Sequence, residues 1–385
     1  MAVPPPLEKQ TGIVTVGDGT LSISSVPVPP VSSSSILVRT CAVALNPSDY
    51  KVPTRLRVSG HLAGGDFAGV IVAVGSAVAS SDRPRCKPWV VGDRVFGAVH
   101  GCNPTNPQSG AFAEYIDADP AILTRIPQGW DWYKAAAFGG ICVGAVALAL
   151  YKEIGLALPP QVDVEKDVDS AVKVAHSLAS NDDLGRTVLV YGASTACGTM
   201  AIQLLRLSGY IPIAVCSSHN NAMVSSYGAA SVFDYHSPSC AADIKTATKN
   251  QLRFVLDCIG TAQSTALCYA AIARTGGRYV SVERYPESAA MRKLVQGSWV
   301  MMLDMFGRGV DMKGGYDRKV DPAARDLGRR LFAGLEMLAQ DEDIRPHPMR
   351  LVRSGSSWAE SVLAGIDMLQ KGQVSGEKLV VEIRV

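Results

Sequence analysis

Short apolar segments separated by glycine, proline and aspartate fill the chain up to about residue 151. They include SILVRTCAVAL (35–45), GVIVAVGSAV (69–78), DRVFGAVHG (93–101) and GAFAEYID (110–117). Such spacing is typical of short strands joined by turns. The first part of the chain is therefore predicted to be mostly β.

From residue 187 the pattern changes to strand and helix in alternation. The strand-like segments are TVLVY, IPIAVCS, SVFDY, RFVLDC and GRYVSV, and ACGTMAIQLLRLSG after the first of them has helical spacing. Alternation of this kind predicts a parallel sheet covered by helices. The expected fold class is α/β.

The last part of the chain again has short strand-like segments, as the first part does. A helix (LGRRLFAGLEMLAQ), the strand-like MRLVRS, a second helix and a closing strand KLVVEIR follow one another from about residue 323. We therefore expect a discontinuous first domain of residues 1–155 and 316–385, and a second domain of residues 156–315. The Pro-led, charged segment 157–186 is predicted to be a surface insertion.

Length and charge limit the classes of partner that the protein can be expected to bind. A chain of 385 residues suits two domains, and 37 basic against 35 acidic residues without a polybasic run give no sign of nucleic acid or an anionic membrane. The N-terminal MAVPPPLEKQ lacks an apolar signal core, and the apolar stretch 135–150 is shorter than the roughly 20 residues of a membrane span. We expect a cytoplasmic protein in which that stretch is a buried helix. Nine cysteines without a C-x-x-C pair fit reduced thiols.

The segment YGASTACGT (191–199) has the character of a dinucleotide-binding turn. Gly192 and Gly198 bracket a turn between a strand and a helix, where backbone N–H groups can receive a pyrophosphate. The hydroxyls of Ser194 and Thr195 are expected to add donors. After the next strand, CSSHN (216–220) contains no acid that would bind a ribose 2′-hydroxyl, and His219 can carry positive charge, so NADPH is favoured over NADH.

No metal site is expected. Cys41 lies in an apolar run, Gly65 stands where a ligand histidine could sit, and the six histidines are scattered singly. Hydride transfer without a Lewis acid disfavours alcohol oxidation and favours reduction of an activated carbon–carbon double bond. Activity should therefore be indifferent to chelators.

Several long motifs carry a family resemblance. NPSDYK (46–51), GGDFAGVIVAVGSAV (64–78), VGDRVFG (91–97), GAFAEY (110–115), the glycine turn and SGEKLVVEI (375–383) resemble the zinc-free medium-chain dehydrogenase/reductases. More narrowly, residues 191–220, AASVFDYHSP and KGQVSGEKLVV are similar to fungal trans-acting enoyl reductases of polyketide biosynthesis. The resemblance implies a GroES-like, mostly β substrate domain formed by both chain ends and a Rossmann domain with a doubly wound parallel sheet.

The resemblance also implies positions for the ligands. The implied cofactor-binding residues are Ser48, Asp49, Tyr50, Lys51, Ser194, Thr195, Ala196, Cys197, Ser217, Ser218, His219, Asn220, Tyr235, Val282, Glu283, Val374 and Ser375. The implied substrate-binding residues are Gly144, Ala145, Val146, Ala147, Leu148, Ala149, Leu150, Tyr151, Met302, Leu303, Asp304, Met305 and Phe306. No unique catalytic acid is identified; Lys51 and Tyr50 are candidate orienting groups, and water is an alternative proton source.

The function that the resemblance implies is NADPH-dependent reduction of enoyl thioesters held on the acyl carrier domain of a highly reducing polyketide synthase, or of a hybrid with a peptide synthetase. Lys51, Arg55 and Arg57 are a candidate docking patch for the acidic carrier, and a monomer is expected. Two alternatives stay open. One is a stand-alone quinone or alkenal reductase, and the other is a non-catalytic NADPH-binding adaptor.

Overall fold

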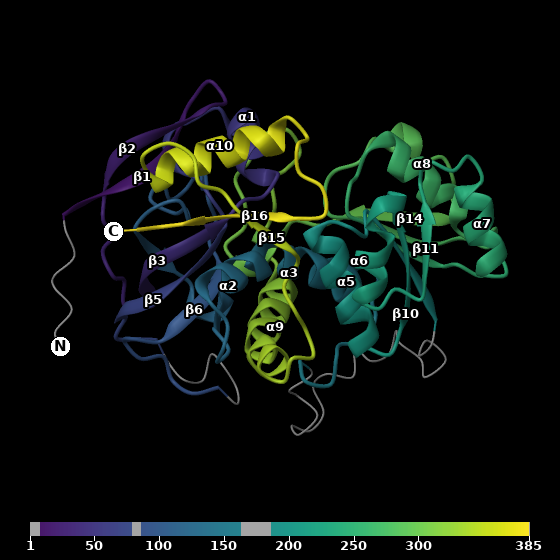
Figure 1. The fold of residues 1–385 in the computed structure, drawn as a ribbon, viewed down its shortest axis with the longest axis horizontal. Coiled ribbons are helices and arrows are strands. Elements are labelled where there is room, and N and C mark those ends of the chain that lie inside the picture. Colours follow the sequence, from purple (N-terminus) through teal and green to yellow (C-terminus); the bar gives the residue numbers. More distant parts are fainter. Residues whose placement is uncertain (1–7, 79–85, 163–185, 385) are drawn as a thin grey trace. The chain divides into compact units, whose positions relative to one another are not determined.

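The computed structural model describes residues 8–78, 86–162 and 186–384, and its chain divides into two compact units (Figure 1). The first unit comprises Met1–Ile141 and Leu303–Val385, and the second comprises Cys142–Met302. The predicted surface insertion at 157–186 lies almost wholly outside the described residues.

The larger sheet of the first unit joins both ends of the chain. Its order is β15 (Met349–Leu351), β16 (Lys378–Glu382), β3 (Ile36–Ala44), β5 (Asp66–Val74), β6 (Arg94–Ala98) and β8 (Leu123–Arg125), with β7 (Tyr115–Ala118) paired to β3. Eight of the nine residues of β3 are buried, because the strand has neighbours on both edges and is covered on both faces. All of the strands predicted from the first and last parts of the chain are confirmed.

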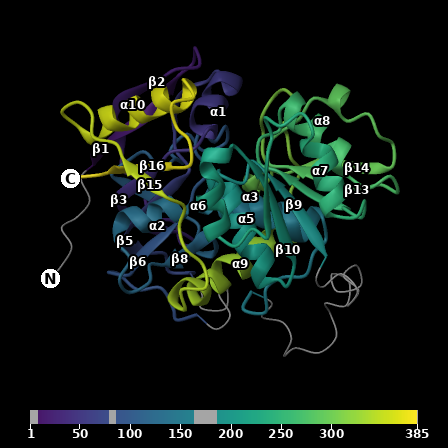
Figure 2. The same cartoon turned by 45° about the vertical axis from the view of Figure 1, so that its right-hand side comes forward.

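A second, three-stranded sheet and several helices complete the first unit. The small sheet has the order β2 (Leu21–Pro27), β1 (Lys9–Val16) and β4 (Ser59–Leu62). The helices are α1 (Ser48–Leu56), α2 (Trp132–Phe138), α9 (Pro322–Gln340) and α10 (Trp358–Gln370). Helix α10 lies against β16 (Figure 2) and begins with a capping box between Ser357 and Glu360, which satisfies N–H groups at its start.

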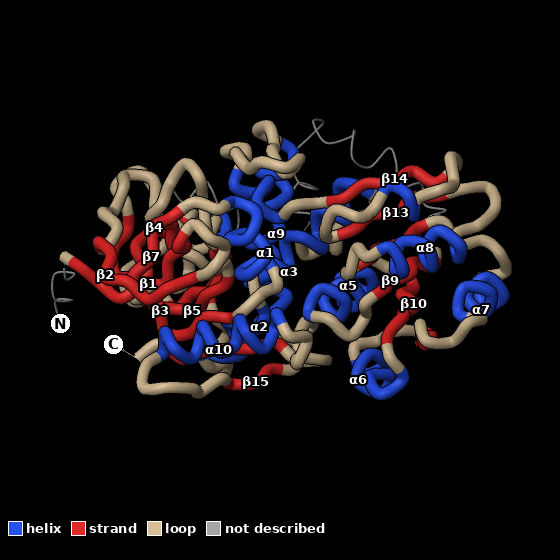
Figure 3. The backbone as a smooth tube through the Cα atoms, turned by 90° about the horizontal axis from the view of Figure 1, so that it is seen from above, coloured by secondary structure: helices blue, strands red, loops and turns tan. Residues whose placement is uncertain are grey.

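The second unit is a six-stranded parallel sheet between helices. Its order is β11 (Ser231–Asp234), β10 (Ile211–Cys216), β9 (Thr187–Tyr191), β12 (Phe254–Asp257), β13 (Gly277–Ser281) and β14 (Val295–Trp299). Helices α5 (Ala196–Leu207) and α6 (Asn221–Ser226) cover one face, and α7 (Cys240–Ala247) and α8 (Ala262–Ala271) the other (Figure 3). The five predicted strands are confirmed, and β14 is a sixth that the sequence pattern missed.

The apolar stretch 135–150 is part of a longer helical run than predicted. The run Trp132–Glu153 has 22 residues and is long and apolar enough to cross a membrane, so the expectation that it is too short was wrong. Burial agrees better with a core helix, since 83% of its most apolar window is buried within the protein. The run also bends at Gly139, which has a φ of 72° between α2 and α3 (Gly140–Ala147), and it ends in one π-helical stretch, Leu148–Glu153.

The cysteines behave as expected for a reduced protein. All nine are free thiols, and seven of them are buried. Burial raises the pKa of the Cys102 thiol to about 12 and that of Cys216 to about 11, so neither thiol is reactive at neutral pH.

Candidate cofactor site

The strand order of the second unit creates a place for a ligand at the carboxyl ends of the strands. From β9 the chain moves outward through β10 and β11, and then crosses to β12 on the other side of β9. Adjacent strands whose connections leave in opposite directions open a crevice between them, where nucleotides bind in doubly wound folds. The turn after β9 lies at this crevice.

Two glycines give that turn its shape. Gly192 has a φ of 72°, a left-handed conformation that glycine adopts without strain. A side chain at Gly198 would place its Cβ only 2.5 Å from the Gly192 carbonyl oxygen and the Ala193 Cα, so the first turn of α5 packs directly onto the loop. The backbone therefore forms a tight cradle at the N-terminus of α5, and this cradle fits a pyrophosphate.

Thr195 caps α5. Its backbone φ is −85°, a conformation that threonine adopts without strain, and its hydroxyl accepts a hydrogen bond from Gly198 N at 3.0 Å. The same hydroxyl donates to the Gly192 carbonyl at 2.8 Å. The hydroxyl is thus engaged within the turn, and the expectation that Thr195 adds a phosphate donor stays a prediction. Helix geometry still leaves the N–H of Ala196 directed out of the helix end.

The loop after β10 holds the residues predicted to read the adenosine end of the cofactor. Ser217 donates to the Tyr235 hydroxyl at 2.8 Å, and the Asn220 side chain lies 3.1 Å from His219 Nε2. The ring of Tyr235 packs against that of His236, with centroids 4.1 Å apart. The structure therefore brings Ser217, His219 and Tyr235 together at one corner of the sheet.

Sequence reasoning missed an acid at this corner. Asp234 ends β11 and is paired in register with Cys216, the last residue of β10. Its carboxylate accepts bonds from the backbone N–H of His236 at 2.9 Å and from His236 Nδ1 at 2.8 Å, and these bonds lower the pKa of Asp234. The carboxylate also accepts a bond from Ser218, so a negative charge borders the loop that the sequence presented as free of acids.

The turn after β12 is a further feature that the sequence reading left out. Asp257, fully buried, accepts from the N–H groups of Ile259 and Gly260 and from the hydroxyls of Ser264 and Tyr279. Burial raises the pKa of Asp257, while these four donors act in the opposite direction. The turn beside the crevice is therefore held rigidly from within the sheet. The strand-final sequence DCIG was the available signal.

Val282 and Glu283 follow β13 at the same edge. Val282 N donates to the Asp257 carbonyl at 3.1 Å, and Glu283 N donates to the Ser281 hydroxyl at 3.3 Å. Their backbone is thus tied to the end of β12 and to the end of β13 itself. Their predicted contact with the cofactor stays a prediction.

In the first unit, the predicted residues 48–51 form the first turn of α1, which a buried polar cluster supports. Lys378 Nζ donates to Asn46 Oδ1 at 2.6 Å and to Asp66 Oδ2 at 2.8 Å, and Asn46 Nδ2 donates to the same Asp66 oxygen at 2.9 Å. The other Asp66 oxygen accepts from Ile141 N at 2.8 Å. We call Asn46, Asp66 and Lys378 the buried triad.

The triad and Asp49 fix the loop that leads into α1. The carboxylate of Asp49 is buried and accepts from Asn46 N at 2.7 Å, so this side chain points into the protein and caps the loop. Tyr50 and Lys51 are half-buried. Val374 and Ser375 lie in the same unit, in the segment between α10 and β16.

The predicted substrate residues lie in two helical segments. Residues 144–151 run from α3 into the π-helical stretch, and Tyr151 is buried with its hydroxyl 3.0 Å from Ser208 Oγ. Residues 302–306 form a 3₁₀ helix, in which Met305 is fully buried and Asp304 forms an ion pair with Arg318 at 3.7 Å. The hydrogen bond to Ser208 joins Tyr151 to the C-terminal end of α5. The acyl-binding role of both segments stays a prediction.

No group of three or more His, Cys, Asp or Glu side chains that could hold a metal ion occurs among the described residues. A side chain at Gly65 would meet that of Ile141 at 2.7 Å, so the position corresponding to a ligand is filled by packing.

The two units define the class of protein. The alcohol dehydrogenase GroES-like domain family matches residues 32–128, and the zinc-binding dehydrogenase family matches residues 196–310. CurK enoyl reductase has a similar crystal structure, with a TM-score of 0.71, 16% identity and coverage of 97% of this chain and 99% of that one. This is the medium-chain dehydrogenase/reductase fold, with a nicotinamide cofactor bound by its Rossmann domain.

The sequence relatives are more specific. The trans-enoyl reductase ucsL of Acremonium sp is 46% identical over 390 residues, covering 97% of each chain. The trans-enoyl reductase mpsG of Macrophomina phaseolina is 42% identical over 374 residues, covering 97% of this chain and 98% of its own. The chain belongs to the trans-enoyl reductases and is an oxidoreductase that reduces carbon–carbon double bonds.

Proposed function

We propose that this protein reduces α,β-unsaturated thioesters with NADPH, in trans, on the acyl carrier domain of a highly reducing polyketide synthase or synthase–peptide synthetase hybrid. The observation that carries the proposal is full-length similarity to trans-enoyl reductases, at 46% identity for ucsL. The glycine cradle at the start of α5 supports the nucleotide part. When bound, a nicotinamide cofactor would supply the hydride for the β-carbon, and the α-carbon would take up a proton.

The protein's own residues are proposed to position the cofactor and the substrate. The cradle and the N-terminus of α5 hold the pyrophosphate, and the buried triad holds the loop that presents Tyr50 and Lys51. These two side chains are proposed to orient the substrate thioester or the cofactor ribose. A donor aimed at the thioester carbonyl would stabilise the enolate oxygen as charge develops on it. Water or one of these side chains delivers the proton.

The carrier domain is proposed to dock at the start of the first unit. Arg55 and Arg57 lie at the exposed end of α1, and Arg55 is stacked over the Tyr316 ring at 4.3 Å. Positive charge on a fixed guanidinium suits an acidic carrier and mainly raises the rate of association. The enzyme is proposed to act as a monomer in the cytoplasm.

The preference for NADPH gives a prediction about Asp234. Because this carboxylate lies next to Ser218, it opposes a 2′-phosphate, and Asp234→Asn is expected to lower the KM for NADPH by about three- to tenfold while changing that for NADH little. The double variant Ser217→Asp with His219→Ala adds a negative charge and removes a side chain that can be positive. It should therefore raise the KM for NADPH far more than that for NADH. Initial rates with both cofactors measure these ratios.

The matched control for Asp234 is Asp243→Asn on α7, where the carboxylate accepts from Ser239 at the surface. It should leave both KM values unchanged. Equal changes for NADPH and NADH in the Asp234 and Ser217/His219 variants would show that this corner does not read the 2′-phosphate.

Reconstitution tests the function as a whole. The synthase, NADPH and malonyl donor are incubated with and without this protein, and the products are compared by mass spectrometry. Omission should give a more unsaturated, prematurely released product, and addition should restore the reduced one. The same product in both mixtures, together with turnover of quinones or free enals, would indicate a stand-alone reductase. Tight NADPH binding without any reduction would indicate an adaptor.

A further inference from the structure

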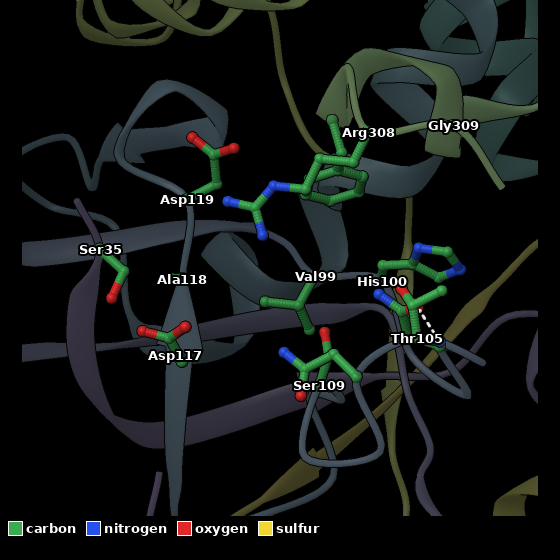
Figure 4. A pocket seen from close by; sticks show the side chains of 13 residues that line it. Ser35, Val99, His100, Thr105, Ser109, Asp117, Ala118, Asp119, Arg308 and Gly309 are labelled. Carbon is green, nitrogen blue, oxygen red and sulfur yellow. Dashed lines mark hydrogen bonds between the residues drawn. The ribbon is translucent and has the colours of Figure 1, made fainter. Parts of the chain in front are cut away.

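A polar cavity of about 210 Å³ lies within the first unit, apart from every residue predicted to bind the cofactor (Figure 4). Its walls come from the start of β3, the end of β7, the loops on either side of β7 and the segment that follows the 3₁₀ helix at 302–306. The polar residues that carry the argument are His100, Asp117, Asp119 and Arg308. Phe306 is the one lining residue that also belongs to the predicted substrate set.

Two residues that line this cavity each have a buried side-chain atom without a hydrogen-bond partner among the described residues. His100 is only 7% exposed, and its Nε2 has no hydrogen-bond partner among the residues that the structure describes. Asp117 Oδ1 has no partner among them either, although Ser35 donates a hydrogen bond to the Asp117 carboxylate. A buried polar group without a partner is unfavourable, so a ligand that brings hydrogen-bonding groups to these two atoms would be stabilised at this cavity.

The charges of the cavity are balanced. Arg325 forms a two-point ion pair with Asp119, at 2.8 and 3.0 Å, and thereby neutralises it. Burial lowers the pKa of His100 to about 4, so its ring is neutral at physiological pH. Arg308 is close enough to act on the pKa of both His100 and Asp117, and in Figure 4 its guanidinium points toward the side of the cavity where Asp117 and Asp119 lie.

This arrangement selects a chemical class. An anion would meet the carboxylate of Asp117, a cation would meet Arg308, and an alkyl group would leave Asp117 Oδ1 and His100 Nε2 unpaired. A hydroxyl group donates one hydrogen bond and accepts up to two through a single atom. It can therefore donate to Asp117 Oδ1 and accept from Arg308 and from His100 Nε2, in the tautomer that carries the ring proton there, while remaining neutral.

We propose that this cavity, the hydroxyl pocket, binds an aliphatic hydroxyl group carried by the acyl chain of the substrate. The proposal rests on the proposed function for its choice of an acyl chain, and Phe306 connects the pocket to the segment predicted to line that chain. The pocket makes the enzyme selective for hydroxylated enoyl intermediates over purely alkyl ones. A free polyol is the other source of the same chemistry.

Direct binding is measured by NMR of the histidine rings, with the His100 signals identified by their loss in His100→Gln. The probes are the N-acetylcysteamine thioesters of ω-hydroxyoctanoic and octanoic acid, which have no double bond to reduce, and glycerol. The His100 signals should move with the hydroxyoctanoyl thioester and stay in place with the octanoyl one. Equal movement with both thioesters, or none with either, overturns the proposal. If glycerol at the same concentration shifts the His100 signals, the pocket binds a free polyol, and the proposal that it binds the acyl chain is overturned.

Kinetics provide the second arm, in which kcat/KM is compared for enoyl thioesters with and without a hydroxyl along a series of chain positions. At the best position the preference for the hydroxylated chain should fall about tenfold in Arg308→Met and in Asp117→Ala, as expected for loss of one hydrogen bond. Arg308 is exposed, so its variant should fold normally, and Asp343→Ala at an exposed site is the control for Asp117.

The two proposals fail in different ways. Movement of the His100 signals without reduction of any enoyl thioester would leave the hydroxyl pocket standing and remove the proposed function. Reduction of enoyl thioesters with no hydroxyl preference, unchanged by both variants, would do the reverse.

Discussion

Replacing Lys378 with methionine is expected to destabilise the protein by about 3–5 kcal/mol, the usual cost of removing one partner from a buried ion pair. Both side chains are almost completely buried, at 4% exposure for Lys378 and 0% for Asp66, and their charged atoms lie 2.8 Å apart. Without the ammonium group, the donors left to the Asp66 carboxylate within the described part of the chain are the Asn46 amide and the Ile141 N–H. Denaturation in urea, followed for the transition of the first unit, measures the loss.

A double variant separates the buried charge from simple loss of packing. In Lys378→Met with Asp66→Asn, the two amides at positions 46 and 66 can bond to each other and no charge is left in the core. The double variant should therefore be more stable than Lys378→Met alone. The control is Lys371→Met, because Lys371 also forms a 2.7 Å ion pair, with Asp367, but is 59% exposed. It should cost no more than about 1 kcal/mol. Equal losses at 371 and 378 would contradict the role given to the buried triad.

The strands of the parallel sheet could be predicted where nearly all residues of a strand are apolar. Four of the five residues of β9 are buried, since helices cover both faces of the sheet. Strand β14 lies at the edge and buries only Val295, so its sequence VQGSW shows neither an apolar run nor alternation. The sequence pattern had no feature by which to detect it.

Candidate-site residues that follow one another in the chain could be found from sequence, whereas those joined across it could not. The turn at Gly192 and Gly198 has a local signature. The triad joins Asp66 to Lys378 over 312 positions, and a single sequence carries no information about such a pairing. Asp234 was missed for a related reason: it belongs to β11, and only the parallel pairing of β10 with β11 brings it beside the loop that was read as lacking an acid.

Acidification should destabilise the first unit through two buried histidines. Burial lowers the pKa of His100 to about 4 and that of His347 to about 3, with smaller contributions from the positive charges of Arg308 and Lys378 respectively. Both are well below the value of about 6.5 for a histidine in an unfolded chain. The unfolded protein therefore binds a proton at each site below pH 6.5, and the folded protein does not.

The direction and size of the effect follow from this difference. The contribution of the two histidines to the free energy of unfolding is fully present above pH 6.5. It is lost as the pH falls toward their pKa values in the folded protein, by about 2 kcal/mol for each histidine at pH 5. Asp117 works in the opposite direction, because its raised pKa lets the folded state take up a proton as pH falls. The comparison of interest is thus between variants, and it uses the change in unfolding free energy between pH 7.5 and pH 5.

Glutamine at each position keeps a neutral polar side chain that does not titrate in this range. His100→Gln and His347→Gln should each reduce the pH-dependent loss by about 2 kcal/mol, and together by about 4 kcal/mol, since the two sites titrate separately. Any constant destabilisation caused by the substitutions cancels, because each variant is compared with itself at the two pH values. A double variant that loses as much stability between pH 7.5 and pH 5 as the natural sequence would mean that both rings already accept protons in the folded state. His100 would then be charged inside the hydroxyl pocket, and the neutral ligand chosen for that pocket would no longer follow.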